Sequence, residues 1–219
     1  METEPKYYFK KIREFPFPEL FNAKKVWEIL GKKDGVLKKL KSKVDVKVLD
    51  DVHISGDVVI LEGTVLKPGT VIEGPVYIGK DCVIGPHAYI RKNTIIGNNC
   101  EIGRMEVKGS VIMNNVKAHQ HGYIGDSIVG DSVNIGAGVV LTNFKFGGSD
   151  IKLGELTLGR KFGAVFGDGT SVGCNTCTMP GTFIGPETWI YPNCNVNGFV
   201  PEKMIVKHKQ PHEIVQRRD

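Results

Sequence analysis

No apolar run in this sequence approaches the roughly 20 residues that a helix needs to span a bilayer. The first residues, METEPKYYFKKIREF, contain neither the apolar stretch nor the small-residue cleavage site of a secretory signal. No basic stripe with interleaved aromatic residues is present, which argues against a nucleic-acid-binding surface. These absences predict a cytoplasmic protein that binds neither membranes nor nucleic acid.

Cysteine is scarce, and its count of five is odd, which favours free thiols over a set of disulfides. Cys174 and Cys177 form the pair CNTC, but no second pair stands at zinc spacing, so no metal site is expected. The net charge is +5, and much of the excess lies in residues 32–43, KKDGVLKKLKSK. This segment is either a solvated lysine face or a surface that attracts anionic partners.

The strongest pattern is an aliphatic residue at every sixth position. It is followed by glycine at several places, Ile78-Gly79 and Ile102-Gly103 among them, and a small or β-branched residue often stands four positions after it. A helical period of 3.6 cannot produce a strict six, and hairpins would need turn residues at a wider spacing. The pattern begins at Val48, resumes at Val129 and resumes again at Phe166; it comprises Val48, Ile54, Ile60, Leu66, Ile72, Ile78, Ile84, Ile90, Ile96, Ile102, Val129, Ile135, Leu141, Phe166, Val172, Thr178, Ile184, Ile190 and Val196.

This repeat resembles the hexapeptide repeat of left-handed parallel β-helices. The resemblance implies a mainly β fold in which three hexads form one coil of a triangular prism. The aliphatic residue points inward, and glycine, Asn or Asp occupies the corners, where positive φ costs little. Cys82 and Cys100 lie 18 residues apart and would stack in the core, as reduced thiols rather than as a disulfide.

The ends of such a prism need covering, because stacking leaves open strand edges there. Residues 1–46 are predicted to form a helical N-terminal cap, 47–201 the β-helix and 202–219 a C-terminal tail that adds a last strand or helix. Asn22 would begin a helix that ends at Gly31, with Trp27 and Leu30 packed inward. A second short helix would run from Asp34 to about Leu40.

Two segments interrupt the hexads, residues 107–123 and residues 144–161. Insertions in repeat proteins gather on one face and often carry function. Between these segments stands GYIGDSIVGDSVNIGAGVVLTNF. It resembles the acetyltransferase half of bifunctional glucosamine-1-phosphate acetyltransferase/N-acetylglucosamine-1-phosphate uridyltransferases. The archaeal-type sugar-1-phosphate nucleotidylyltransferase/acetyltransferases are more similar still. Their large nucleotidyltransferase domain has no counterpart here, so nucleotidyl transfer is not expected.

The resemblance implies a group of cationic side chains that bind a sugar phosphate. Arg91, in AYIRKN, matches the family arginine that holds the phosphate, and Lys108, in MEVKGS, matches a lysine with the same task. Lys161, in GRKFGAVFG, matches a further substrate lysine. A guanidinium and ammonium groups around one anion form strong charge-assisted hydrogen bonds.

Other matches concern the sugar and the cosubstrate. Tyr123 and Asn134 match sugar-contacting groups, and Asn143 stands where a family asparagine lies beside the reacting amine. Ala137 and Cys174 fall where the family binds acetyl-CoA, mostly through its backbone. Sites of this family lie between subunits of a trimer, so the resemblance implies a homotrimer, with acetyl-CoA as cosubstrate and no metal.

The chain departs from the family at the catalytic base. Gln120 replaces the family histidine three residues before Tyr123, and glutamine cannot accept a proton, whereas an imidazole near neutral pKa can. Three alternatives remain: His121 supplies the base, His119 supplies it, or the chain has no base. A second departure is Phe144-Lys145, where the bacterial enzymes carry a tyrosine and an acid, which alters the acceptor pocket.

Two functions follow from these residues. One is acetyl transfer from acetyl-CoA to an amino or hydroxyl group of a sugar phosphate or nucleotide sugar. The other is a non-catalytic, trimeric sugar-phosphate-binding scaffold that pairs with a separate nucleotidyltransferase.

Overall fold

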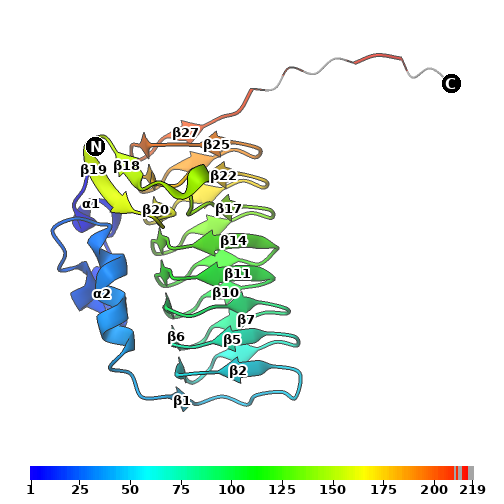
Figure 1. Ribbon diagram of the computed structural model, residues 1–219. Helices are drawn as coiled ribbons and strands as arrows, with labels where there is room; N and C mark the ends of the chain where they lie inside the picture. Colours follow the sequence, from blue (N-terminus) through cyan, green and yellow to red (C-terminus); the bar gives the residue numbers. More distant parts are fainter. Residues whose placement is uncertain (210, 212–213, 217–219) are drawn as a thin grey trace.

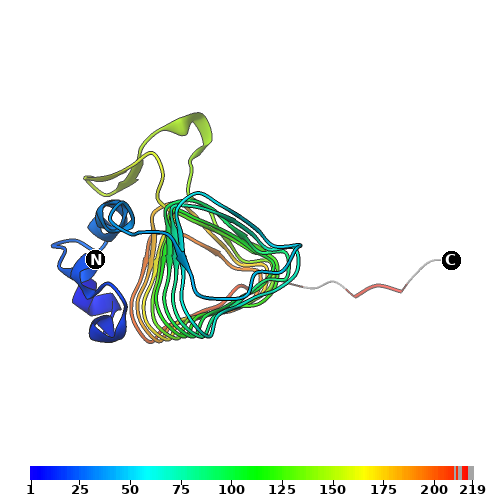
Figure 2. The same cartoon turned by 90° about the horizontal axis from the view of Figure 1, so that it is seen from below.

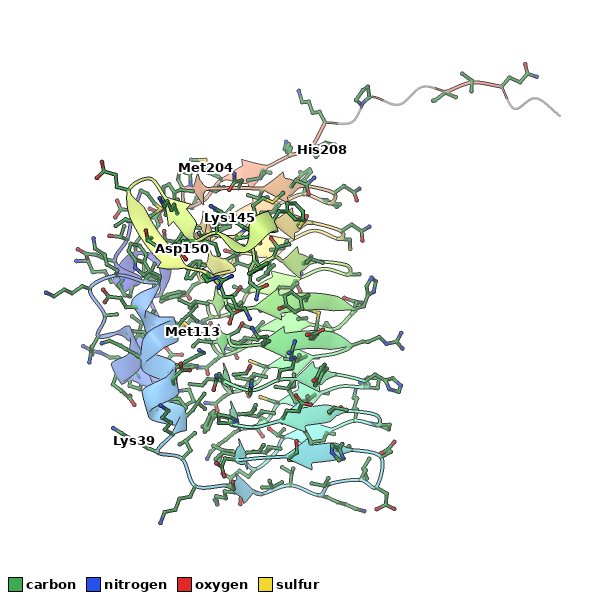
Figure 3. All side chains as sticks on the ribbon, viewed as in Figure 1. Lys39, Met113, Lys145, Asp150, Met204 and His208 are labelled. Carbon is green, nitrogen blue, oxygen red and sulfur yellow. The ribbon has the colours of Figure 1, made fainter. Side chains whose placement is uncertain are left out.

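The computed structural model describes residues 1–209, 211 and 214–216 and consists of stacked parallel coils with three flat faces (Figures 1 and 2). The predicted left-handed parallel β-helix is confirmed. Within the described residues, the faces are parallel sheets of nine, eight and eight strands. Face A contains β1 Lys43–Val44, β3 Val58–Ile60, β6 Val76–Ile78, β9 Thr94–Ile96, β12 Val111–Ile112, β15 Ile128–Val129, β20 Ala164–Phe166, β23 Thr182–Ile184 and β26 Phe199–Val200.

The other two faces follow the same stacking order along the prism. Face B contains β2 His53–Ser55, β5 Val71–Glu73, β8 Tyr89–Ile90, β11 Met105–Lys108, β14 Gly122–Gly125, β17 Val140–Leu141, β22 Cys177–Thr178 and β25 Asn195–Val196. Face C contains β4 Val65–Leu66, β7 Val83–Ile84, β10 Glu101–Ile102, β13 Lys117–Ala118, β16 Asn134–Ile135, β21 Ser171–Val172, β24 Trp189–Ile190 and β27 Ile205–Val206. The chain runs repeatedly from face B to face A to face C.

The hexad residues fill the interior of the prism, as predicted. Ile84, Ile90 and Ile96 are among the residues with no exposed surface in this core. Val48 is an exception, because it is 40% exposed and Val46 and Val52 take the inward positions of the first turn instead. No coil lies beneath residues 45–52 to fix their register, which accounts for the difference.

The two stacked cysteines lie in the core as free thiols. Cys82 and Cys100 are fully buried, and the backbone N–H of Cys100 donates to the Cys82 Sγ at 3.4 Å. Several corners carry Asn or Asp with positive φ, such as Asp81 at 54° and Asn99 at 55°. Both features follow from the period, because residues one coil apart meet along the prism.

The predicted interruption at residues 107–123 is wrong. These residues continue the coils as β11, β12, β13 and β14, and Val107, Ile112, Ala118 and Ile124 are fully buried in the core. The spacing between inward residues shortens from six to five at Ile102–Val107, at Val107–Ile112 and again at Ile124–Val129. Three tighter corners therefore shift the phase of the hexads without inserting any segment.

The second interruption, residues 144–161, is an insertion at the corner between faces B and A. It contains the 3-10 turn η3 Phe146–Gly148 and a two-stranded antiparallel hairpin, β18 Ile151–Leu153 with β19 Leu156–Gly159. Figure 2 shows the hairpin outside the triangular prism, on the side of the N-terminal helices. Ile151 is fully buried against that helical segment's core cluster.

The N-terminal segment is helical, but it covers a side of the prism and not its open end. It comprises α1 Pro5–Tyr8, the 3-10 turns η1 Ile12–Glu14 and η2 Pro18–Phe21, and α2 Glu28–Leu37, which runs along the stacked coils (Figure 1). Its buried Tyr8, Phe9 and Ile29 form a second core with the outward side chains of face A. The outer surface of face A is apolar, so a covering layer removes it from water.

The internal structure of the segment also differs from the prediction. A single helix, α2, continues through Gly31, and no separate helix begins at Asp34. A side chain at Gly31 would point into open space. Trp27 and Leu30 pack against the second core as expected. The ring centroids of Trp27 and Phe183 are 6.1 Å apart, in an edge-to-face arrangement. No helix in the described part of the chain is long and apolar enough to cross a bilayer.

Polar contacts fix the start of the segment to the later coils. Lys11 Nζ donates to the buried Asp131 Oδ1 at 2.8 Å, and the Lys10 N–H donates to Asp168 Oδ2 at 2.7 Å.

At the other end of the chain, the C-terminal tail forms a strand, β27, which pairs with β24. Residues 210, 212–213 and 217–219 of that tail lie outside the described residues.

The buried Tyr8 predicts a loss of stability at alkaline pH. Burial raises the pKa of the Tyr8 phenol well above its ordinary value, and its O–H donates to the Glu2 carbonyl at 2.8 Å. The unfolded tyrosine ionises near pH 10, so the free energy of unfolding falls as pH rises above that value. Between about pH 8 and pH 11, the free energy of unfolding should fall by about 1.4 kcal/mol more in wild type than in Tyr8→Phe. Urea denaturation at both pH values measures the difference, and equal losses would contradict this role of Tyr8.

Candidate functional site

Five of the six predicted substrate residues line one hollow, which we call the cationic hollow. It has a volume of about 390 Å³ and lies where face B meets face A, at the base of the insertion. Its lining consists of Arg91, Lys108, Tyr123, Asn143, Phe144 and Lys161.

The coil geometry explains why these distant residues meet. Arg91 directly follows β8, Lys108 ends β11, and Asn143 lies two residues beyond β17, all of them strands of face B. These strands and β14, which carries Tyr123, pair in register at the usual strand spacing of about 4.8 Å. Equivalent positions of successive coils therefore form a column along the corner of the prism.

Two carboxylates already bind the cations of this hollow. Arg91 Nη1 donates to Glu106 Oε1 at 2.7 Å, and this hydrogen bond raises the pKa of Arg91. Lys108 Nζ donates to Asp126 Oδ2 at 3.0 Å, and the same oxygen accepts a hydrogen bond from the Asn143 amide. An anionic ligand would therefore share or replace these partners.

Glu106 and Asp126 are site residues that the sequence reasoning missed. Asp126 was visible as the acid in GYIGD, and one coil separates it from Lys108. Glu106 pairs in register with Tyr89 and Tyr123, its neighbours in the coils on either side. Burial raises the pKa of the Tyr123 phenol.

Lys161 reaches the hollow from the far end of the insertion. It is exposed, and it forms no ion pair with any residue that the structure describes. Phe144, the first residue of the insertion, is 49% exposed at the same hollow. The insertion thus contributes Lys161, which is unpaired among the described residues, and one exposed aromatic ring to the hollow.

Asn134 does not join the other five within one chain. It lies in β16 on face C, where it pairs in register with Lys117 and Ser171. The cationic hollow is on the opposite side of face B. The expectation that Asn134 converges with Arg91 and Lys108 is therefore not met within a single copy of the chain.

The three candidate catalytic residues line a second hollow, which we call the histidine hollow. His119, Gln120 and His121 form the corner between face C and face B, together with Pro86 and Arg104, around about 250 Å³. His119 Nδ1 lies 3.5 Å from Glu101 Oε2. The strand β14 separates this corner from the cationic hollow, so the two hollows occupy opposite edges of face B.

The predicted acetyl-CoA residues continue this second edge. Gly138, next to Ala137, donates its backbone N–H to the His121 carbonyl at 2.8 Å. In the following coil, the Asn175 N–H, next to Cys174, donates to the Ala137 carbonyl at 2.7 Å. His121, Ala137 and Cys174 therefore belong to successive layers of one corner, although they are far apart in sequence.

The parallel three-sided coil and its hexad core define this chain as a hexapeptide-repeat β-helix protein. Residues 72–210 of the 219 match the GMPPB C-terminal domain. The match covers more than half of the chain, which therefore belongs to the GMPPB C-terminal domain family.

Curated relatives confirm the resemblance recognised in the sequence motifs. The "Bifunctional protein GlmU" of Methanococcus aeolicus is 38% identical over 117 residues, 52% of this chain and 28% of that protein. GlmU of Methanococcus maripaludis strain C5 is 36% identical over 198 residues, 88% of this chain and 48% of that protein. The chain thus spans about half or less of the length of these relatives.

Among solved structures, the UDP-N-acetylglucosamine acyltransferase from Campylobacter jejuni is 16% identical and has a TM-score of 0.46. The superposition covers 71% of this chain and 69% of that one. A similarity this distant carries no information on function.

Proposed function

We propose that this protein transfers an acetyl group from acetyl-CoA to an amino or hydroxyl group of a phosphate-bearing sugar. The observation that carries the proposal is the convergence of Arg91, Lys108, Tyr123, Asn143 and Lys161 on one hollow. The family resemblance selects these five residues from separate parts of the sequence. The GlmU relatives and the "Bifunctional sugar-1-phosphate nucleotidylyltransferase/acetyltransferase" of Sulfurisphaera tokodaii, 39% identical over 98 residues, support the same chemistry.

In this mechanism each reactant is held by one edge of face B, and the two edges belong to neighbouring copies of the chain, so that the acceptor reaches the thioester between copies. Arg91, Lys108 and Lys161 bind the phosphate, and Tyr123 and Asn143 orient the sugar. Acetyl-CoA lies along the edge of Ala137 and Cys174. The acceptor nitrogen or oxygen attacks the thioester carbonyl, and its proton passes to His121 or to a positioned water. Backbone N–H groups stabilise the oxyanion, the C–S bond breaks, and CoA leaves as its thiol after it takes up that proton.

The active assembly in this proposal is a homotrimer. Asn134 lies on face C, so it would contact the sugar only from a second copy of the chain. Face A is covered by the N-terminal segment, which leaves faces B and C for contacts between copies. We place the protein in the cytoplasm, where acetyl-CoA and sugar phosphates are available.

A second function, binding without catalysis, is favoured by one observation. Gln120 replaces the family base, and the residues on either side of it lie in a hollow separate from the cations. A chain that retained phosphate binding and lost the base would act as a scaffold for a separate nucleotidyltransferase.

The deciding experiment is a CoA-release assay with acetyl-CoA and a panel of amino-sugar and sugar phosphates. Arg91→Ala should lower kcat/KM for the best acceptor about 10- to 100-fold, because a charge-assisted hydrogen bond to phosphate is lost. Lys92→Ala is the matched control, since Lys92 is the exposed neighbour and does not line the hollow, and it should be unchanged. Acceptor binding without CoA release in wild type would reject the enzyme and support the scaffold.

A further inference from the structure

The position of Phe144 indicates which of two kinds of acceptor suits the cationic hollow, a simple sugar phosphate or a nucleotide-linked sugar. Among the described residues that line the cationic hollow, Phe144 alone has a wholly apolar side chain, and 49% of it remains exposed. Exposed aromatic rings are costly to leave in water, and a flat ring beside cations suits a ligand that has both a flat group and phosphates.

One edge of this ring lies near a turn of the insertion. A Cβ on Gly148, whose φ is 69°, would lie 3.3 Å from the Phe144 Cζ and 2.9 Å from the Arg160 Nη2. Arg160 Nε in turn donates to the Gly148 carbonyl at 3.1 Å. The Gly148 backbone therefore lies beside the far edge of the ring. A phenyl ring has only two side-chain torsions, so it loses little conformational entropy when a ligand stacks on it.

The cations at the hollow offer contacts for more than one phosphate. Arg91 and Lys108 each have a carboxylate partner, Glu106 and Asp126, and Lys161 has no ion-pair partner among the residues described. The several oxygens of a diphosphate can contact all three cations, provided that they share or replace the two carboxylates.

We propose that Phe144 is a stacking platform for a nucleobase and that the acceptor is a sugar linked to a nucleoside diphosphate. The diphosphate lies on Arg91, Lys108 and Lys161, and the base lies on the exposed part of the Phe144 ring. The identity of the bound molecule as an acceptor rests on the proposed acetyl transfer. The stacking contact itself is a property of binding and does not depend on turnover.

The test measures binding by calorimetry, without acetyl-CoA, of three probes: inorganic pyrophosphate, a hexose 1-phosphate, and purine and pyrimidine nucleoside diphosphates. Wild type should bind at least one nucleoside diphosphate about 10- to 100-fold more tightly than pyrophosphate, the range expected for one stacked base. Phe144→Ala should remove that advantage and leave pyrophosphate binding unchanged, and Phe144→Tyr should retain it.

Phe146→Ala is the matched control, because Phe146 belongs to the same insertion, is fully exposed and does not line the hollow. It should bind every probe as wild type does. The inference is overturned if pyrophosphate and both nucleoside diphosphates bind wild type equally, or if Phe144→Ala weakens all probes alike. Binding of hexose 1-phosphate at least as tight as that of the nucleoside diphosphates also overturns it but leaves acetyl transfer standing. If no probe binds wild type, the cationic hollow itself is not a phosphate site, and the proposed function fails with it.

Discussion

Val111→Asp should destabilise the protein severely, by about 3 kcal/mol or more, although Val111 points away from the interior of the prism. It precedes the inward Ile112 in β12 and is fully buried, because α2 covers face A there. Its neighbours in register are Ile95 and Ile128, which are also fully buried. A carboxylate at this position would have no partner, and an unpaired buried charge carries a penalty of that size.

Val65→Asp is the matched control for this prediction. Val65 precedes the inward Leu66 in β4 as Val111 precedes Ile112, but it lies on face C and is 52% exposed. At a protein concentration where the copies of the chain are separate, a surface substitution of this kind should change the free energy of unfolding by about 0.5 kcal/mol or less. Urea denaturation measures the free energy of unfolding of both variants. If Val111→Asp does not fold, the pair Val111→Ala and Val65→Ala gives the same comparison. Equal effects at the two positions would show that the N-terminal segment does not cover face A in solution.

His121→Ala should lower kcat for acetyl transfer about 10²- to 10⁴-fold, the contribution that general-base catalysis typically makes. Gln120 cannot accept a proton, so we expect a neighbouring histidine to take this role. His121 lies directly below the layer of Ala137, since its carbonyl accepts the Gly138 N–H at 2.8 Å. His119 instead approaches Glu101, with 3.5 Å between Nδ1 and Oε2. His121 is therefore the imidazole adjacent to the predicted acetyl-CoA edge.

His119→Ala is the control, and we expect it to change kcat by no more than a few fold. KM for the phosphate-bearing acceptor should stay the same in both variants, because the cationic hollow is on the other edge of face B. CoA should be quantified by chromatography, since the exposed Cys174 would react with a thiol reagent. If His121→Ala turns over like wild type, a positioned water or another group takes the proton and the assignment of His121 is wrong.

The missed second core shows where sequence reasoning can be extended. The hexads predicted the interior, but the residue before each inward position on face A is also apolar: Val59, Tyr77, Ile95, Val111, Ile128, Val165, Phe183 and Phe199. The equivalent positions on face C include Glu101, Lys117 and Asn134. An apolar residue at this position in every third hexad predicts a covered face, and that signal was present in the sequence.

The phase of the coils was harder to predict. Corners shortened by one residue at 102–107, 107–112 and 124–129 look in sequence like a break, because strict spacing by six fails there. Buried Val107 and Ile112 show that the core side chains set the register and that the corner adapts to it. Shortening a corner by one residue changes the free energy of folding little. An empty core position would lose the free energy gained by burying a side chain and would leave a cavity.

By itself, the sequence determined the repeating coil, most of the inward residues and, through the family resemblance, five of the side chains that line the cationic hollow. Periodicity is a local property, and each hexad carries it independently of the others. Tertiary structure alone decided which residues share an edge. It placed Asn134 on face C, it put Glu106 and Asp126 against the cations, and it brought Phe144 and Lys161 to the hollow from the two ends of the insertion. These contacts depend on how many residues each corner contains and on what covers each face, and both are fixed only when the coils stack and bury their side chains together.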